Sequence, residues 1–158
     1  KRPEEDWMSE QLTKLNTFGM EFTTGYRSEE GFLRNASISY GYISTDKKAG
    51  NHISKYALDY MRNKASASFQ GAILRNLKIA VTGTLYDRCG NYLILSSTGS
   101  ETKAYKPYFL LDARISWEKG VVTLYMDGTN LTSTRYFDYG GLVMPKIWAS
   151  GGIVITIK

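Results

Sequence analysis

The sequence has one cysteine, Cys89, and one histidine, His52, among its 158 residues. A lone cysteine forms no disulfide within the chain, and this pair is too small for a metal site built on cysteine and histidine. Both residues fall in polar, loop-like stretches, so a catalytic Cys–His dyad, whose members must lie within hydrogen-bond reach, is not predicted. A nucleophile elbow, a glycine-rich phosphate loop and paired carboxylates in a plausible cleft are also missing. We therefore expect neither an enzyme nor a cofactor.

Long apolar runs and clustered charge are missing as well. No stretch of about 18 apolar residues occurs, which excludes a membrane-spanning helix but not membrane-spanning strands, because such strands alternate in polarity. The net charge of +5 is spread along the chain, whereas binding to nucleic acid needs a basic patch on one face. Residues 1–6, all charged except Pro3, are not followed by the apolar core of a signal peptide. We expect residues 1–158 to be the C-terminal part of a longer exported protein.

Aromatic residues and glycine are abundant, with 12 Tyr, 6 Phe, 3 Trp and 15 Gly against 3 Pro. This composition is typical of strands joined by tight turns. Period-two alternation is clearest over residues 109–117, where the odd positions are apolar and the even positions include Asp112 and Arg114. Alternation of this kind indicates strands with two unlike faces.

Seven segments show this alternation. They cover residues 12–27, 32–44, 64–72, 77–87, 109–117, 122–129 and 148–157. Residues 54–63 also fit a short helix in a loop, and that alternative stays open. The sequence therefore predicts an all-β fold, an antiparallel up-and-down meander of about seven strands.

The connections alternate between short and long. Short turns are predicted at 28–31, 74–76 and 118–120, and long polar stretches at 45–62, 88–106 and 130–146. Transmembrane β-barrels have this pattern because one rim carries short turns and the other carries extracellular loops, whereas long structureless loops are uncommon in compact soluble domains. Phe109 and Trp117 lie eight residues apart on one face. At about 3.3 Å per residue and a tilt of about 40°, this spacing projects to roughly 20 Å, close to the apolar band between aromatic girdles.

A barrel assigns the two faces to lipid and to a wet lumen. The predicted lipid-facing residues are Phe109, Leu111, Ala113, Ile115, Trp117, Val122, Leu124, Met126, Ile153 and Ile155. The predicted lumen-facing residues are Asp112, Arg114, Tyr125 and Asp127, because charges face lipid only at high cost.

The C-terminal motifs resemble those of one family. In order they are residues 108–117, residues 125–131 ending in Asn130-Leu131, residues 135–141, Met144-Pro145 and the closing strand 148–157; residues 16–21 add a weaker upstream match. This order and spacing is similar to the barrel of TonB-dependent outer-membrane receptors. Residues 56–60 and 135–138 resemble receptors of the Bacteroides group. Such barrels usually end on an aromatic residue, whereas Ile157 and Lys158 stand here.

The resemblance implies a barrel of about 22 strands around an N-terminal plug. The plug and the TonB-contacting segment lie outside this chain. The family takes up iron chelates, cobalamin or glycans across the outer membrane of Gram-negative bacteria, driven by the TonB complex, so the implied partners are the lipid bilayer, TonB and a small nutrient. A passive pore or adhesin barrel and a soluble β-sheet binding module are the alternatives.

Ligand contact is expected in the long stretches. The aromatic candidates are Tyr92, Tyr105 and Tyr139, since tyrosine buries a broad area at small entropic cost; packing between loops is the alternative role. Alone, the fragment is expected to self-associate or to need detergent, because it has unpaired strand edges and one broad apolar face.

Overall fold

The computed structural model describes residues 15–47, 60–96, 99–138 and 142–157. Seven strands form one sheet and two more form a separate hairpin. The strands are β1 (Leu15–Arg27), β2 (Leu33–Lys47), β3 (Tyr60–Leu74), β4 (Leu77–Cys89), β5 (Asn91–Ser96), β6 (Gly99–Ala104), β7 (Tyr108–Lys119), β8 (Val122–Thr129) and β9 (Trp148–Ile155). Among the described residues, no helix is both long and apolar enough to cross a membrane.

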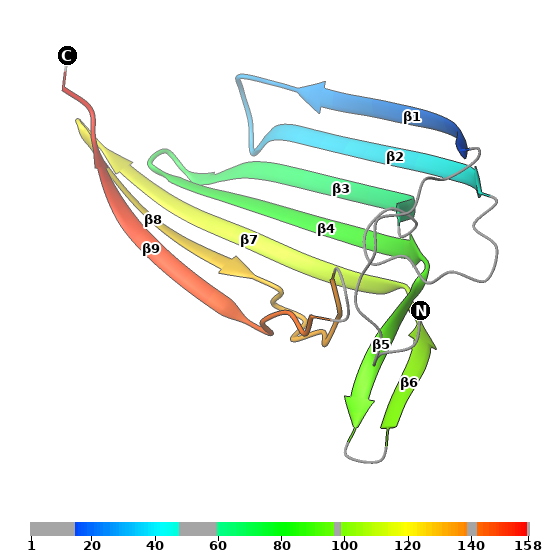
Figure 1. Cartoon of the computed structure of the whole chain (residues 1–158). Coiled ribbons are helices and arrows are strands. Elements are labelled where there is room, and N and C mark those ends of the chain that lie inside the picture. Colours follow the sequence, from blue (N-terminus) through cyan, green and yellow to red (C-terminus); the bar gives the residue numbers. More distant parts are fainter. Residues whose placement is uncertain (1–14, 48–59, 97–98, 139–141, 158) are drawn as a thin grey trace.

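The large sheet is an antiparallel meander in the order β1-β2-β3-β4-β7-β8-β9. Figure 1 shows these strands side by side as a single curved layer. The predicted seven-stranded meander is therefore confirmed. No second layer covers the sheet within the described residues, and the buried apolar side chains there are Tyr105 and Leu110. The sheet has two faces rather than a core.

The strands are longer than predicted at several ends. β2 continues to Lys47, β3 starts at Tyr60 and β7 runs on to Lys119, because cross-strand pairing extends beyond the alternating residues. The helical alternative for residues 54–63 is wrong for 60–63, which belong to β3, and its remainder lies outside the described residues.

The connections alternate between the two ends of the sheet, as predicted. The turns at 28–32, 75–76 and 120–121 lie at one end, the short-turn rim, while the chain leaves β2, β4 and β8 at the opposite end, the long-segment rim (Figure 1). The turn between β7 and β8 has Gly120 at a φ of 60°. Glycine at the first central position, with positive φ, suits a tight hairpin turn.

The sequence predicts a long polar stretch at 88–106 and no strand within it, whereas the structure forms two strands there. This stretch contains the hairpin β5–β6, whose residues pair from Asn91 with Ala104 to Ser96 with Gly99. Gly90, at a φ of 123°, separates β5 from β4. The hairpin projects beyond the sheet from the end of β4, while β4 pairs directly with β7 (Figure 1).

Candidate functional site

One face of the sheet is apolar across all seven strands. A single row of paired residues crosses the sheet on this face: Tyr26, Ala36, Phe69, Val81, Ala113, Gly128 and Ala149. Large side chains near it are exposed, for example Phe22 at 61%, Met126 at 61% and Ile153 at 66%. The apolar surface is therefore continuous, and no described residue of this chain covers it.

The predicted lipid-facing residues all lie on this apolar face. The register pairs Ile115 with Met126 and Trp117 with Leu124, and it pairs Leu124 with Ile153 and Val122 with Ile155. Phe109, Leu111 and Ala113 share the same side of β7, opposite Leu85, Gly83 and Val81 of β4.

Phe109 lies over Gly83 on the apolar face. A Cβ added to Gly83 would stand 2.9 Å from Cζ of Phe109, so the ring occupies the space above the glycine. An aromatic side chain that covers a cross-strand glycine shields the backbone and pins the register.

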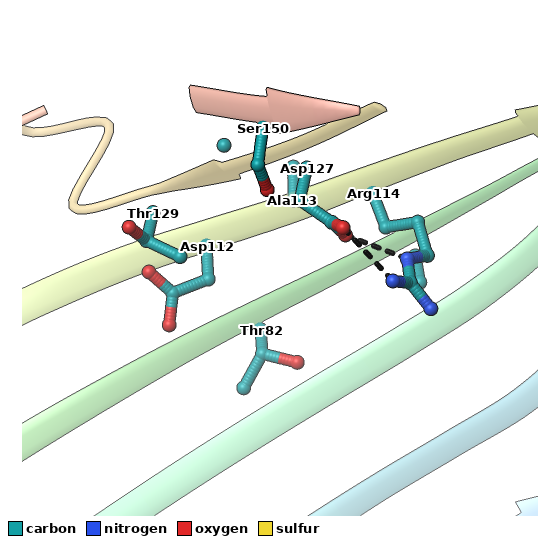
Figure 2. A pocket seen from close by; sticks show the side chains of 9 residues that line it. Thr82, Asp112, Ala113, Arg114, Asp127, Thr129 and Ser150 are labelled. Carbon is teal, nitrogen blue, oxygen red and sulfur yellow. Dashed lines mark hydrogen bonds and ion pairs between the residues drawn. The ribbon is translucent and has the colours of Figure 1, made fainter. Parts of the chain in front are cut away.

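The opposite face is polar and carries the predicted lumen-facing residues. Arg114 donates hydrogen bonds from Nε and Nη2 to the two carboxylate oxygens of Asp127, at 2.6 and 2.8 Å (Figure 2). Its guanidinium also lies 4.6 Å from the ring centre of Tyr125. Asp112, two residues away from Arg114 on β7, instead accepts a hydrogen bond from the backbone N–H of Asn130 at 2.8 Å.

Asp112, Arg114 and Asp127 border a hollow of about 320 Å³ on the polar face, together with Thr82, Thr129 and Ser150 (Figure 2). Hydroxyl groups dominate the neighbouring strands. The Oγ atoms of Ser37 and Ser68 lie 2.6 Å apart, and Oγ of Ser66 lies 3.1 Å from Oγ1 of Thr84. The polar face thus combines the Arg114–Asp127 ion pair on β7 and β8 with hydroxyl groups on the neighbouring strands.

Asn130 fastens the segment that follows β8, a role that the sequence did not predict. Its side chain is 3% exposed, and its Nδ2 donates to the carbonyl oxygens of Thr134 at 2.8 Å and Pro145 at 3.2 Å. Its Oδ1 accepts from the N–H of Thr134 at 2.9 Å, and its backbone has a positive φ of 51°. Asparagine is one of the few residues that tolerate this conformation.

The candidate ligand aromatics Tyr92 and Tyr105 pack against each other, with ring centres 5.0 Å apart. Tyr92 also stacks on Phe137 at 4.6 Å, and the Tyr105 side chain is 8% exposed. Both rings therefore join the hairpin β5–β6 to the segment after β8. Tyr139 lies outside the described residues.

An ion pair strengthens this junction. Nη2 of Arg88 donates to Oδ1 of Asp138 at 2.9 Å, and the arginine side chain is 6% exposed. The Tyr105 hydroxyl donates to the carbonyl oxygen of Asp138 at 3.3 Å. The segments that follow β4 and β8 therefore meet over the end of β4.

A row of three tyrosines lies beside this junction. Tyr86 stacks on Tyr108 with their ring centres 5.0 Å apart, and Tyr108 stacks on Tyr136 with their ring centres 4.6 Å apart. Burial raises the pKa of the Tyr136 phenol above its usual 10.0, and the negative charge of Asp138 raises it further.

A hydrogen-bonded chain of polar side chains lies on the apolar face at the long-segment rim. Tyr40 donates to Oδ1 of Asn63 at 2.7 Å, and Nδ2 of Asn63 donates to Asp87 at 2.7 Å. Arg62 completes the chain with hydrogen bonds to the same Asp87 oxygen at 3.1 and 2.9 Å. The register shift between Met61 and Asn63 brings both neighbours, 62 and 63, to one carboxylate.

Groups of three or more His, Cys, Asp or Glu side chains that could hold a metal ion do not occur among the described residues. No family model, curated protein or solved structure matches the chain.

Proposed function

We propose that this chain forms seven consecutive membrane-spanning strands of an outer-membrane β-barrel. The observation that carries the proposal is the exposed apolar face, which is continuous over every strand of the sheet. Soluble monomers rarely expose an apolar patch of more than a few hundred Å². A lipid bilayer is the environment in which a sheet keeps such a face uncovered by other protein.

The second face and the rims agree with this environment. On the polar face, Arg114 and Asp127 form an ion pair and Asp112 accepts a hydrogen bond, as is expected on the wall of a water-filled lumen. The short-turn rim would face the periplasm and the long-segment rim the exterior, where barrels carry their longer loops.

We further propose that the barrel belongs to a TonB-dependent receptor of a Gram-negative bacterium. Support comes from the resemblance of residues 108–117 and 125–131, which include Asn130-Leu131, to motifs of that family. The function would be active uptake of a scarce nutrient, such as an iron chelate, cobalamin or a glycan, with energy supplied through TonB. The long-segment rim would contribute to nutrient contact.

The membrane proposal is tested on β7 in the full-length protein, reconstituted into phosphatidylcholine vesicles. Single spin labels replace consecutive residues from Leu110 to Ser116 in a cysteine-free background, and their collision rates with oxygen and with a water-soluble nickel chelate are measured. We expect oxygen to favour the odd positions and the nickel chelate the even ones. Odd positions that are shielded from both reagents would show that protein covers the apolar face, and the proposal would then fail.

The transport proposal is tested by growth. A strain that lacks the full-length gene, and a second strain that lacks TonB function, are supplied with haem, ferric siderophores, cobalamin or glycans as the limiting nutrient. We expect both strains to lose growth on the same nutrient. Uptake that persists without TonB function would instead indicate a passive pore.

A further inference from the structure

The hollow on the polar face lies where β4, β7, β8 and β9 run side by side. Figure 2 shows Asp112 and Thr129 on one side of it and Arg114 on the other, with Thr82 and Ser150 between them. Its volume of about 320 Å³ is at the lower end of the range of about 300–1,000 Å³ for small-molecule sites. The hollow therefore has room for one small ring of a ligand rather than for a large macrocycle.

The Arg114 side chain is held in place on two sides of this hollow. Its Nε and Nη2 donate to the carboxylate of Asp127 at 2.6 and 2.8 Å, and its guanidinium lies 4.6 Å from the ring centre of Tyr125. Within the described residues its Nη1 has no hydrogen-bond partner, and the side chain is 53% exposed. A guanidinium that is already fixed loses little freedom when a ligand accepts its remaining N–H groups.

Three hydroxyl groups around the hollow form no hydrogen bond with the part of the chain that the structure describes. They belong to Thr82, Thr129 and Ser150. Each hydroxyl can donate one hydrogen bond and accept others. Oδ1 of Asp112 accepts from the N–H of Asn130, which leaves its Oδ2 as a further acceptor. The hollow thus presents donors and acceptors side by side, as a ligand with adjacent hydroxyl groups requires, because each of its hydroxyls also donates and accepts.

The charges around the hollow disfavour an anionic ligand. Asp112 and Asp127 contribute two carboxylates against the single guanidinium of Arg114, so the lining has a net charge of −1. An iron chelate that carries carboxylate or catecholate groups would be repelled by this excess of negative charge. A neutral ligand has no such repulsion to overcome.

A row of uncharged hydroxyl groups continues from the hollow across the sheet. Thr82 pairs with Ser68 on β3, and Ser68 pairs with Ser37 on β2. The Oγ atoms of Ser37 and Ser68 lie 2.6 Å apart, and both side chains are partly exposed. Ser37 in turn pairs with Gly25 on the edge strand β1, so this row carries no ionisable side chain beyond Asp112. The surface next to the hollow is therefore also suited to a neutral, hydroxyl-rich ligand.

We propose that the hollow is a subsite for one ring of a neutral saccharide, and that further sugar units of the same ligand lie along the hydroxyl row on β2, β3 and β4. Nη1 of Arg114 donates to one sugar hydroxyl and Oδ2 of Asp112 accepts from another. The hydroxyl groups of Thr82 and Ser150 bind the remaining sugar oxygens. This inference rests on the proposed uptake function and narrows its nutrient to a neutral glycan.

Ligand class is tested on an array of immobilised neutral and acidic oligosaccharides. The full-length protein is applied in lauryldimethylamine oxide, a detergent without a sugar headgroup. We expect binding to neutral oligosaccharides. Binding to acidic ones alone, or to none, would overturn the inference.

The site is tested by calorimetric titration of the best-bound neutral oligosaccharide. We expect Thr82→Val and Ser150→Ala each to weaken binding by about 3–10-fold, the effect of one lost hydrogen bond. Thr123→Val makes the same change on the polar face of β8, outside the hollow, and should leave affinity unchanged. Affinity that neither of the first two variants lowers would show that the saccharide binds elsewhere.

Access to the hollow is tested with Ser150→Cys in a cysteine-free background of the full-length protein. We expect rapid reaction with a small neutral methanethiosulfonate reagent, and a several-fold slower reaction when the same oligosaccharide is present at saturation. A cysteine that reacts in urea but not in the folded protein would show that a protein segment fills the hollow, which would overturn the subsite.

These results are separable from the test of transport. Saccharide binding at the hollow together with uptake that persists without TonB function would refute the transport proposal and leave the subsite standing. Uptake of a ferric siderophore that needs TonB function, without saccharide binding, would refute the subsite alone.

Discussion

Arg114 and Asp127 face each other directly across β7 and β8, and the arginine holds both carboxylate oxygens. The guanidinium also lies over Tyr125, whose ring covers Gly152 of β9: a Cβ on that glycine would stand 2.6 Å from the Tyr125 hydroxyl. Because residue 152 has no side chain, the Tyr125 ring fits between it and the Arg114 guanidinium. This stacking joins the last three strands.

The Arg114–Asp127 pair is exposed, so its contribution should depend on salt. We expect Arg114→Met and Asp127→Asn to lower the urea midpoint of unfolding from vesicles at low ionic strength, and the difference to shrink near about 1 M salt, where charges are screened within about 3 Å. Arg75→Met, in the turn between β3 and β4, removes the same charge elsewhere and is the control. A loss that salt leaves unchanged would contradict the electrostatic explanation.

Gly83 should tolerate no side chain while Phe109 covers it. We expect Gly83→Ala to cost about 1–3 kcal/mol of unfolding free energy, as overpacking does, and Phe109→Leu in the same molecule to recover part of that loss. Gly41→Ala, at a position with no atom within 4 Å of the added Cβ, is the matched control. Equal effects at both glycines would refute the role assigned to Phe109.

Asn130 should be the most sensitive residue of the final long segment. Asn130→Ala removes the hydrogen bonds to Thr134 and Pro145 and places alanine at a positive φ, so we expect a loss of about 2–4 kcal/mol and faster proteolysis within 131–147. Ser133 also has a positive φ, of 53°. Ser133→Gly relieves that conformation and should leave stability unchanged or slightly raised.

Hairpin β5–β6 and the segment after β8 should loosen together. Asp138→Asn weakens the ion pair with Arg88, and Phe137→Ala removes the ring beneath Tyr92. We expect either change to accelerate amide hydrogen exchange across Asn91–Ala104, although neither residue belongs to the hairpin. Thr123→Ala on β8 is the control. Unchanged exchange in the hairpin would show that the two segments are independent.

Tyr136 should add a pH-dependent contribution to stability. Its folded-state pKa is raised above 10.0, mainly by burial, so its neutral form stabilises the fold below about pH 10 and this contribution is lost as pH rises through the folded pKa. As the pH rises from about 10 to 12, we expect the free energy of unfolding of the Tyr136→Phe variant to fall less than that of the natural protein. Urea titration at each pH measures this free energy. Equal losses would mean that other groups cause the alkaline decline.

Much of the sheet is predictable because its alternation is local. Within residues 109–117 and 122–129, the alternation between adjacent residues shows which face of the sheet each side chain is on. Strand β8 has the predicted bounds. Hairpin β5–β6 was missed because Tyr92, Leu93, Ile94 and Leu95 are apolar on both parities and leave no alternation to detect.

The contacts at the long-segment rim escape prediction for another reason. Arg88 and Asp138 are 50 residues apart, and no local pattern links them. The Asp87 chain depends on a register shift in β3 that the spacing of the side chains does not reveal. Side-chain polarity assigns a residue to a face, whereas these sites depend on pairing between distant strands.

The direct pairing of Tyr86 with Tyr108 makes the chain between them an insertion rather than a structural link. Strands β4 and β7 are neighbours whatever the intervening hairpin contains, and Gly90 lets the backbone turn away before it can disturb their register. The hairpin is therefore an exchangeable module. The hairpin can be lengthened, shortened or replaced, which changes the surface of the long-segment rim and leaves the pairing of β4 with β7 intact.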